Sequence, residues 1–350
     1  MIKMSENRDA IRRFDRASRG LGQRLYERII RISDDCKKAA QEIRLRVNKP
    51  VMICTEKDTF YLTADSKAVT EIISGKMIIT TQRDIADCFQ NLCSYSVYSR
   101  QNEIRKGYIT MQGGHRAGLC GTAVYRNGEI YNIRDISGIN LRIARELLGC
   151  ADKVIEYIKD LNCGMLLCGP PCCGKTTLLR DIARQLSTVY SKKTAVIDER
   201  GELAATFSGV PQNDLGYSDV LDGFSKSDGV MHAVRCLSPD YVICDEIGTS
   251  NETSLLEESL NAGVKVIATL HAGSASELLK KPQGVALLKT GAFDKIIFLK
   301  SRENPGDIKE VLSKEDLLGG KGGRNSDDNI RRSSVGSFDF KKNNKPNFVF

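Results

Sequence analysis

The pattern of apolar and polar positions changes character near residue 150. Upstream of that point, charged and apolar residues alternate over 42–47, and a turn at 48–50 separates this run from a second apolar run at 51–54. Such alternation around a short turn predicts a β-hairpin. A second hairpin is predicted around Gly113-Gly114, and 138–144 is expected to form a further strand. Together with interspersed helical signals, these strands predict an α+β domain over residues 21–148.

Downstream of residue 150, short apolar runs alternate with stretches of helical periodicity. This pattern is typical of a parallel sheet with crossover helices. A loop over 201–224 contains four glycines and Pro211, and a stretch of this length in a compact domain is usually functional. The predicted strands of this sheet are 164–168, 194–198, 241–245, 264–270 and 295–299.

Both ends of the chain lack a strong core pattern. Residues 1–20 are charged and weakly periodic, which predicts a flexible N-terminal segment or a frayed helix. Residues 319–329 contain almost no apolar side chains, so 313–350 is expected to be a largely disordered tail. The predicted organisation is therefore a flexible segment, the α+β domain, a second domain over 149–312, and the tail.

Composition is that of an ordinary globular protein, with 41% hydrophobic and 27% charged residues in a chain of 350. No apolar run reaches the ~18 residues of a membrane-spanning helix, and the polar residues 1–8 lack the apolar core expected of a signal peptide. A cytoplasmic location is expected. The net charge of +8 permits contact with nucleic acid or an anionic surface without requiring it. The 12 cysteines and three histidines show no zinc-ligand spacing.

One motif gives the most specific indication of what this chain binds. Between a predicted strand and a predicted helix, the chain reads as a phosphate-binding loop, in which backbone N–H groups and a lysine surround the phosphates of a nucleotide. Its residues, with the one that follows, are Gly169, Pro170, Pro171, Cys172, Cys173, Gly174, Lys175, Thr176 and Thr177. Lys175 would meet the β- and γ-phosphates, and the Thr176 hydroxyl would ligate Mg²⁺. ATP and Mg²⁺ are the expected cofactors.

A second nucleotide motif follows at 241–246, where an apolar strand ends in two carboxylates. Asp245 would hold Mg²⁺, and Glu246 would act as the general base that polarises the attacking water. The alternative is a surface carboxylate pair after a core strand. Two other strand ends should converge here, one carrying Glu199 and the other carrying Thr269 and His271, which are expected to face the γ-phosphate.

An additional strand combined with a glutamate beside the Mg²⁺ aspartate indicates a RecA-like P-loop ATPase domain of the additional-strand catalytic-glutamate class. In this α/β fold, the strand after the Mg²⁺ strand inserts beside the phosphate-loop strand. ATPases of this class work at subunit interfaces, where an arginine of the neighbour neutralises charge. Strand alternation favours Arg142 and Arg46 for that role. The N-terminal arginines considered are Arg44, Arg46, Arg116, Arg134, Arg142 and Arg145.

The ordered blocks of the chain also resemble a known family. The family is that of stage III sporulation protein AA, sporulation ATPases related to the type II and type IV secretion and pilus-motor ATPases. The resemblance covers about residues 40 to 312. Paired cysteines at 172 and 173 are a departure from what we expected; they could be loop filler or sensitive to oxidation. The blocks that carry the resemblance to this family include 42–46, 113–116, 140–146, 174–184, 196–200, 211–216, 218–223, 238–240, 245–248, 261–264 and 269–272.

The resemblance implies a homo-hexameric ATPase in the mother-cell cytoplasm. It would energise a secretion-like channel between mother cell and forespore and would lie at the membrane through the membrane proteins of that channel. It also implies that Asp198, Glu199 and His271 flank the nucleotide. Two other classes compete with this interpretation. A nucleic-acid-dependent RecA-like ATPase would show salt-sensitive stimulation by DNA, although nucleic acid is not expected as a partner. A small-molecule kinase is disfavoured because no arginine-rich lid segment follows the phosphate loop.

Overall fold

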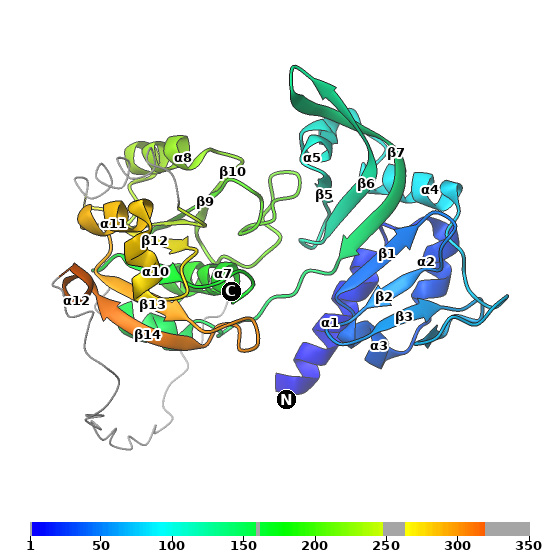
Figure 1. The fold of residues 1–350 in the computed structure, drawn as a ribbon, viewed down its shortest axis with the longest axis horizontal. Helices are drawn as coiled ribbons and strands as arrows, with labels where there is room; N and C mark the ends of the chain where they lie inside the picture. Colours follow the sequence, from blue (N-terminus) through cyan, green and yellow to red (C-terminus); the bar gives the residue numbers. More distant parts are fainter. Residues whose placement is uncertain (1, 159–161, 248–262, 319–350) are drawn as a thin grey trace, which may run out of the picture.

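The computed structural model describes residues 2–158, 162–247 and 263–318 (Figure 1). The N-terminal part contains an antiparallel sheet of seven strands in the order β4-β3-β2-β1-β7-β6-β5. Its strands are β1 (Glu42–Arg46), β2 (Met52–Cys54), β3 (Thr59–Leu62), β4 (Ala68–Val69), β5 (Tyr108–Thr110), β6 (Arg116–Arg126) and β7 (Glu129–Arg142). Its helices are α1 (Ile2–Ser18), α2 (Gln23–Ile29), α3 (Asp34–Ala39), α4 (Gln82–Leu92) and α5 (Gln101–Arg105), with a 3₁₀ turn at Tyr98–Arg100.

Strand alternation gives β1 one buried and one partly open face. Ile43 and Leu45 are fully buried in the core, while the arginines between and after them lie on the opposite face. Both predicted hairpins are present. β1 pairs antiparallel with β2, and β5 pairs antiparallel with β6 around Gly113 and Gly114, whose φ angles are +89° and +75°. Glycine is suited to these left-handed turn positions.

Two expectations for this part are corrected. Residues 1–20 were expected to be a flexible segment or a frayed helix; Ile2–Ser18 forms the helix α1, and its Phe14 and Ala17 are fully buried in the N-terminal core, so flexibility is wrong for this part of the segment. The strand expected at 138–144 is the end of the much longer β7. The first half of β7 was missed because it extends beyond the core in a long hairpin with β6, where Ile130 and Tyr131 are exposed and no buried face imposes alternation.

The C-terminal part contains a second sheet of seven strands, in the order β10-β9-β11-β12-β8-β13-β14. All neighbours are parallel except β13 and β14. Its strands are β8 (Met165–Cys168), β9 (Thr194–Asp198), β10 (Asp219–Asp222), β11 (Tyr241–Cys244), β12 (Lys265–Leu270), β13 (Lys295–Leu299) and β14 (Ile308–Ser313). Its helices are α6 (Asp152–Ile155), α7 (Lys175–Thr188), α8 (Lys226–His232), α10 (Ala275–Lys280), α11 (Pro282–Lys289) and α12 (Lys314–Leu318), with a 3₁₀ turn at Glu156–Ile158 and a π turn at Ala233–Leu237.

The strand order confirms the predicted insertion. β12 follows β11 in the chain and pairs with both β11 and β8, so it lies between the strand of the second motif and the strand before the phosphate loop. Helices cover both faces of the sheet. One buried cluster includes residues of α6 and α7, and the other includes residues of α8, α10, α11 and α12. The carboxyl ends of the parallel strands therefore meet at one edge, which is where such sheets bind ligands.

Three further points differ from the sequence-based expectation. β10 lies inside the long loop 201–224 and was missed because its two apolar residues stand between aspartates. β14 was missed because it is a half-exposed edge strand. The tail expected from 313 includes the end of β14 and all of α12, with Leu317 buried, so disorder at 313–318 is wrong; residues 319–350 lie outside the described residues.

The two sheets stand side by side, joined by the segment after β7 (Figure 1). The N-terminal hydrophobic cluster ends at Ile143, and the clusters around the second sheet begin at Ala151. The predicted boundary between 148 and 149 falls in this interval and stays a prediction.

A candidate nucleotide site at the ends of the parallel strands

The phosphate loop connects the end of β8 to the start of α7, as its motif requires. Gly174 has a φ of +95°, and a Cβ atom at this position would lie 2.9 Å from the backbone nitrogen of Gly306. Only glycine satisfies both constraints. The same Gly306 nitrogen donates to the Cys173 carbonyl at 2.8 Å, which ties the loop to the β13–β14 turn. α7 begins at Lys175, directly after the loop glycine Gly174, and a helix N-terminus at a phosphate loop favours anions.

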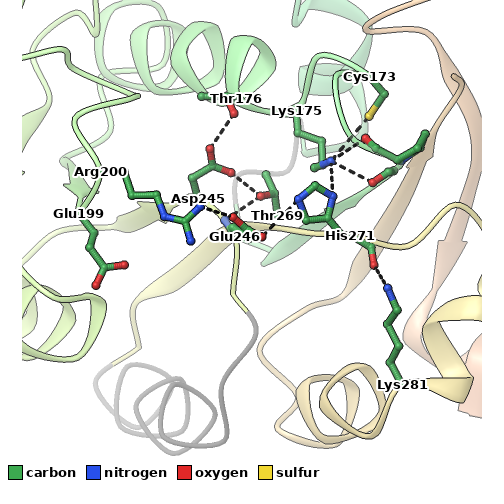
Figure 2. Close-up of polar contacts among 12 residues, drawn as sticks. Cys173, Lys175, Thr176, Glu199, Arg200, Asp245, Glu246, Thr269, His271 and Lys281 are labelled. Carbon is green, nitrogen blue, oxygen red and sulfur yellow. Dashed lines mark hydrogen bonds and ion pairs between the residues drawn. The ribbon is translucent and has the colours of Figure 1, made fainter. Parts of the chain in front are cut away.

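Lys175 lies over this loop and is almost fully buried. Its Nζ donates to the carbonyl oxygens of Gly169 and Pro170, both at 2.9 Å, and lies 3.2 Å from Nδ1 of His271 (Figure 2). Because an ammonium group only donates, Nδ1 of His271 acts as the acceptor in this contact, and the ring proton belongs on Nε2. The structure thus brings the two predicted residues Lys175 and His271 together.

Thr176 and Asp245 form the second half of the site. The Thr176 hydroxyl donates to Oδ2 of Asp245 at 2.7 Å, and the Thr269 hydroxyl donates to Oδ1 of the same carboxylate. Thr269 was expected to face the γ-phosphate. Instead it is fully buried under Asp245 and also accepts the backbone N–H of Glu246 at 2.8 Å. β12 therefore positions the second motif.

The pair Thr176 and Asp245 fits Mg²⁺. This ion usually takes few protein oxygens and completes its shell with water and phosphate. Among the residues that the structure describes, no group of three or more histidine, cysteine, aspartate or glutamate side chains is placed to hold a metal ion. A metal ion at this site would therefore need water and phosphate oxygens as further ligands. One hydroxyl and one carboxylate beside a phosphate loop are the donor set that a Mg²⁺–nucleotide complex requires.

Glu246 is held from two sides. Its Oε2 accepts from Arg200 at 2.7 Å, and its Oε1 lies 3.3 Å from Nε2 of His271 (Figure 2). Its backbone is in the left-handed region, with a φ of +47°, and its carbonyl accepts from Lys226 at 2.6 Å. His271 therefore contacts both the phosphate-loop lysine and the predicted general base.

The acidic segment after β9 forms the wall opposite the loop. Asp198 is buried and accepts the backbone N–H groups of Glu202 at 2.8 Å and Ala204 at 2.7 Å, which fixes the turn. Glu199 lies further out, with its carboxylate 3.5 Å from Lys226. A cleft runs along this wall, and its lining is Ile197, Asp198, Glu199, Arg200, Glu202, Lys226, Asp245 and Glu246.

Arg200 is the site residue that sequence analysis missed. It follows the predicted strand end by two positions, which was the available signal, but its contact with Glu246 depends on tertiary structure. Nearby, Arg180 of α7 donates twice to the carbonyl of Glu202, at 3.1 and 2.7 Å. Burial lowers the pKa of Arg180 from its usual value, although the surrounding carboxylates act in the opposite direction.

Neither arginine favoured for action on a neighbouring subunit touches the site of its own chain. Arg46 donates to Asn140 and to backbone carbonyls of its own sheet, and Arg142 is largely exposed with its Nε 3.7 Å from Glu42. Their role in a neighbour stays a prediction. Arg116 is the arginine of the predicted group that reaches this wall within the described chain, through Glu202 at 3.1 Å and the carbonyl of Arg200 at 2.9 Å.

The loop cysteines differ in environment. Cys172 is exposed with a φ of +61°, whereas Cys173 is buried with its Sγ 3.9 Å from Nζ of Lys175. Cys168, at the end of β8, is fully enclosed, and burial raises the pKa of its thiol to about 12. The Cys168 thiol therefore stays protonated and unreactive.

The inserted strand, the phosphate loop, and the Thr176–Asp245 pair with Glu246 beside it define a RecA-like P-loop ATPase fold. The family model "Sporulation stage III, protein AA" matches residues 13–317, so the chain belongs to this family. The match begins earlier than the resemblance expected from about residue 40, and it includes most of the second half of α1.

Comparison with individual proteins agrees with this assignment. The chain is 38% identical over 281 residues to Stage III sporulation protein AA of Bacillus subtilis, which covers 79% of this chain and 87% of that protein. The fold is similar to that of the pilus retraction motor PilT with bound ADP (TM-score 0.53, 17% identity, 82% of this chain and 86% of that chain). It is also similar to the Yersinia pseudotuberculosis ATPase DotB (TM-score 0.50, 15% identity, 81% and 79%). None of the helices in the described ranges is long and apolar enough to cross a membrane.

Proposed function

We propose that this chain is a Mg²⁺-dependent ATPase that assembles into a homo-hexameric ring and energises a channel between mother cell and forespore during sporulation. The observation that carries the catalytic part is the contact of Thr176 with Asp245 beside Lys175 and Glu246. Membership of the sporulation family supports the biological part. The protein would act in the mother-cell cytoplasm and lie at the membrane through partner proteins of the channel.

The residues divide the work by chemistry. Lys175 would leave the loop carbonyls to bind the β- and γ-phosphates, while the loop N–H groups and the start of α7 hold the remaining oxygens. Thr176 and Asp245 would hold Mg²⁺, which when bound neutralises charge on the phosphate oxygens. Thr269 keeps the Asp245 carboxylate in place through its hydrogen bond.

Glu246 would orient the attacking water and accept its proton. Its carboxylate contacts His271, which also contacts Lys175 of the loop, whereas Glu199 pairs with Lys226. Position therefore favours Glu246 over Glu199 as the base, with Glu199 flanking the nucleotide. His271, on the Nε2–H tautomer, would respond to the phosphate because it contacts Lys175 directly.

The assembly is tested by multi-angle light scattering of the purified protein, with and without a non-hydrolysable ATP analogue and Mg²⁺. The proposal expects a hexamer in the presence of nucleotide. A monomer under all conditions at micromolar concentration would contradict the ring. Adding duplex or single-stranded DNA to the same samples tests the nucleic-acid-dependent alternative, which predicts salt-sensitive complex formation.

A further inference from the structure

Two residues of the N-terminal sheet hold the wall of the nucleotide site. The hydroxyl of Tyr108 donates to the carbonyl of Arg200 at 3.1 Å, and Nη2 of Arg116 donates to the same carbonyl at 2.9 Å. Nη1 of Arg116 also pairs with Glu202 at 3.1 Å, and its guanidinium stacks over the Tyr108 ring at 3.5 Å. β5 and β6, which carry these side chains, are paired strands, so the sheet presents the two groups together.

The side chain of Arg200 contacts Glu246, the predicted general base. Its guanidinium donates to Glu246 at 2.7 Å, while its carbonyl is bound by the N-terminal sheet. Arg200 therefore contacts both parts of the chain: its backbone carbonyl is bound by the N-terminal sheet, and its side chain contacts Glu246. The turn around it is otherwise fixed by buried Asp198 and by Arg180.

The contact with Arg200 restricts the ability of the Glu246 carboxylate to accept a proton from water. One carboxylate oxygen of Glu246 is bound by Arg200 and the other lies against His271. A general base must present a free oxygen to the water that it deprotonates. The Arg200–Glu246 pair is partly solvent-exposed, and exposed ion pairs hold their geometry weakly by themselves. Fixing the Arg200 backbone from the N-terminal sheet removes much of that freedom.

We propose that Arg116 and Tyr108 are positioning residues that act through Arg200 to restrain Glu246, so that movement of the N-terminal sheet away from this segment releases the base for hydrolysis. The inference rests on the proposed ATPase function and adds a regulation of the same site within one chain. It differs from an arginine supplied by a neighbour, because Arg116 binds the protein backbone and Glu202 of its own subunit.

The test is a double-mutant cycle on full-length protein. Arg200→Ala removes the side chain on Glu246 but leaves the carbonyl that Arg116 binds. We expect it to raise kcat for ATP several-fold with little change in KM. Arg116→Gln should raise kcat in the same direction, and it should have no further effect in the Arg200→Ala background. Tyr108→Phe, which keeps the stacked ring, should give a smaller rise. An increase in kcat is a change that damage to the fold does not produce.

A matched control is available in the N-terminal part, on helix α5. Arg105 also stacks over a tyrosine, Tyr131, at 4.8 Å and donates to its carbonyl at 2.9 Å, but it lies outside the contact with Arg200. Arg105→Gln should leave kcat unchanged. A fall in kcat for Arg200→Ala would overturn the restraint. Equal effects of Arg116→Gln in both backgrounds would show that Arg116 does not act through Arg200.

Hydrogen exchange separates failure of this inference from failure of the ATPase assignment. The amides of Glu202 and Ala204, which bond to Asp198, should exchange faster in Arg116→Gln than in the unsubstituted protein, whether or not ATP is hydrolysed. Unchanged exchange over 198–204 would overturn the inference. Faster exchange without ATP hydrolysis by any variant would keep the contact as a positioning device and reject the proposed reaction.

Discussion

Glu246 and Glu199 are two carboxylates in one cleft, and their neighbours distinguish them. Glu246 lies against Arg200 and against His271, which also contacts Lys175, whereas Glu199 pairs with Lys226. An amide keeps the shape of a glutamate but cannot accept a proton. The identity of the general base can therefore be tested by paired substitutions of near-identical size.

We expect Glu246→Gln to bind ATP normally and to hydrolyse it at least ~100-fold more slowly, the range for loss of a general base. Glu199→Gln serves as the matched control and should retain most of the activity. Nucleotide affinity is measured by calorimetry and turnover by phosphate release. Normal turnover by Glu246→Gln together with an inactive Glu199→Gln would assign the base to the acidic segment instead.

His115 gives the folded protein a specific sensitivity to acid. It is fully buried, its Nδ1 accepts the backbone N–H of Ala144 at 3.0 Å, and burial lowers the pKa of the ring to about 4. Below the ordinary pKa of about 6.5, the unfolded chain binds a proton that the folded chain does not. The free energy of unfolding should therefore fall as pH drops from about 6.5 towards 4, by roughly 3 kcal/mol from this group.

Denaturant unfolding at pH 7 and pH 5 measures the part of this effect that falls between those pH values, roughly 2 kcal/mol. His115→Gln removes the titrating ring and should flatten the dependence over this interval, while the same substitution at exposed His232 should not. An unaltered pH dependence in His115→Gln would show that His115 is not the group responsible.

Much of the candidate site could be predicted from local sequence motifs. The residues that could not be predicted are those whose role depends on contacts between segments distant in the sequence. The phosphate loop, Asp245, Glu246 and His271 follow from local motifs whose spacing is fixed by strand–loop–helix geometry. Arg200 and the buried role of Thr269 do not, because their partners lie directly after β11 or on the N-terminal sheet. No local pattern encodes those distances.

At the scale of elements, burial decides which ones the sequence pattern reveals. β1, β8 and β12 have fully buried positions that impose alternation or a continuous apolar run. β10, β14 and the outer half of β7 lie at an edge or beyond the core, so their sequences are only weakly constrained. The insertion of β12 was predictable because an additional strand and a glutamate beside the Mg²⁺ aspartate indicate the additional-strand class, in which that insertion occurs.

Substitutions in helix α1 test whether the N-terminal segment contributes to the stability of the core. Phe14 is fully buried, and Arg12 on the same helix is exposed. Phe14→Ala should lower the free energy of unfolding by about 3–5 kcal/mol, the usual cost of emptying a buried aromatic site. Arg12→Ala should change it by less than ~0.5 kcal/mol. Denaturant unfolding compares the two variants, and equal small effects would mean that α1 is dispensable to the fold.

At the scale of the whole molecule, Arg142 and Arg46 of the first sheet make no hydrogen bond or ion pair with the nucleotide site within the described part of their own chain. The side chain of Arg142 is 73% exposed, and its one ion pair within the described residues is with Glu42. A guanidinium suits phosphate oxygens, so a ring would give this side chain a partner in the next subunit. Arg46 is the second candidate, although its guanidinium is already bonded within its own sheet.

Mixing experiments test action between subunits. Arg142→Ala and Lys175→Ala should each be inactive alone, because one lacks the arginine offered to the neighbour and the other cannot bind phosphate. Mixed rings contain some sites with both residues intact, so hydrolysis should recover after subunit exchange. Absence of recovery, with exchange shown by fluorescence energy transfer between labelled subunits, would place Arg142 in a structural role.

The central claim is that the cluster of Lys175, Thr176, Asp245 and Glu246 hydrolyses ATP with Mg²⁺. Steady-state phosphate release by the purified protein tests it most directly, with Mg²⁺ or with excess chelator and with Lys175→Ala as the paired variant. The account predicts hydrolysis that requires Mg²⁺ and that Lys175→Ala abolishes together with nucleotide binding. Hydrolysis that persists unchanged in Lys175→Ala or in chelator, or ATP affinity unaltered by that substitution, would contradict it.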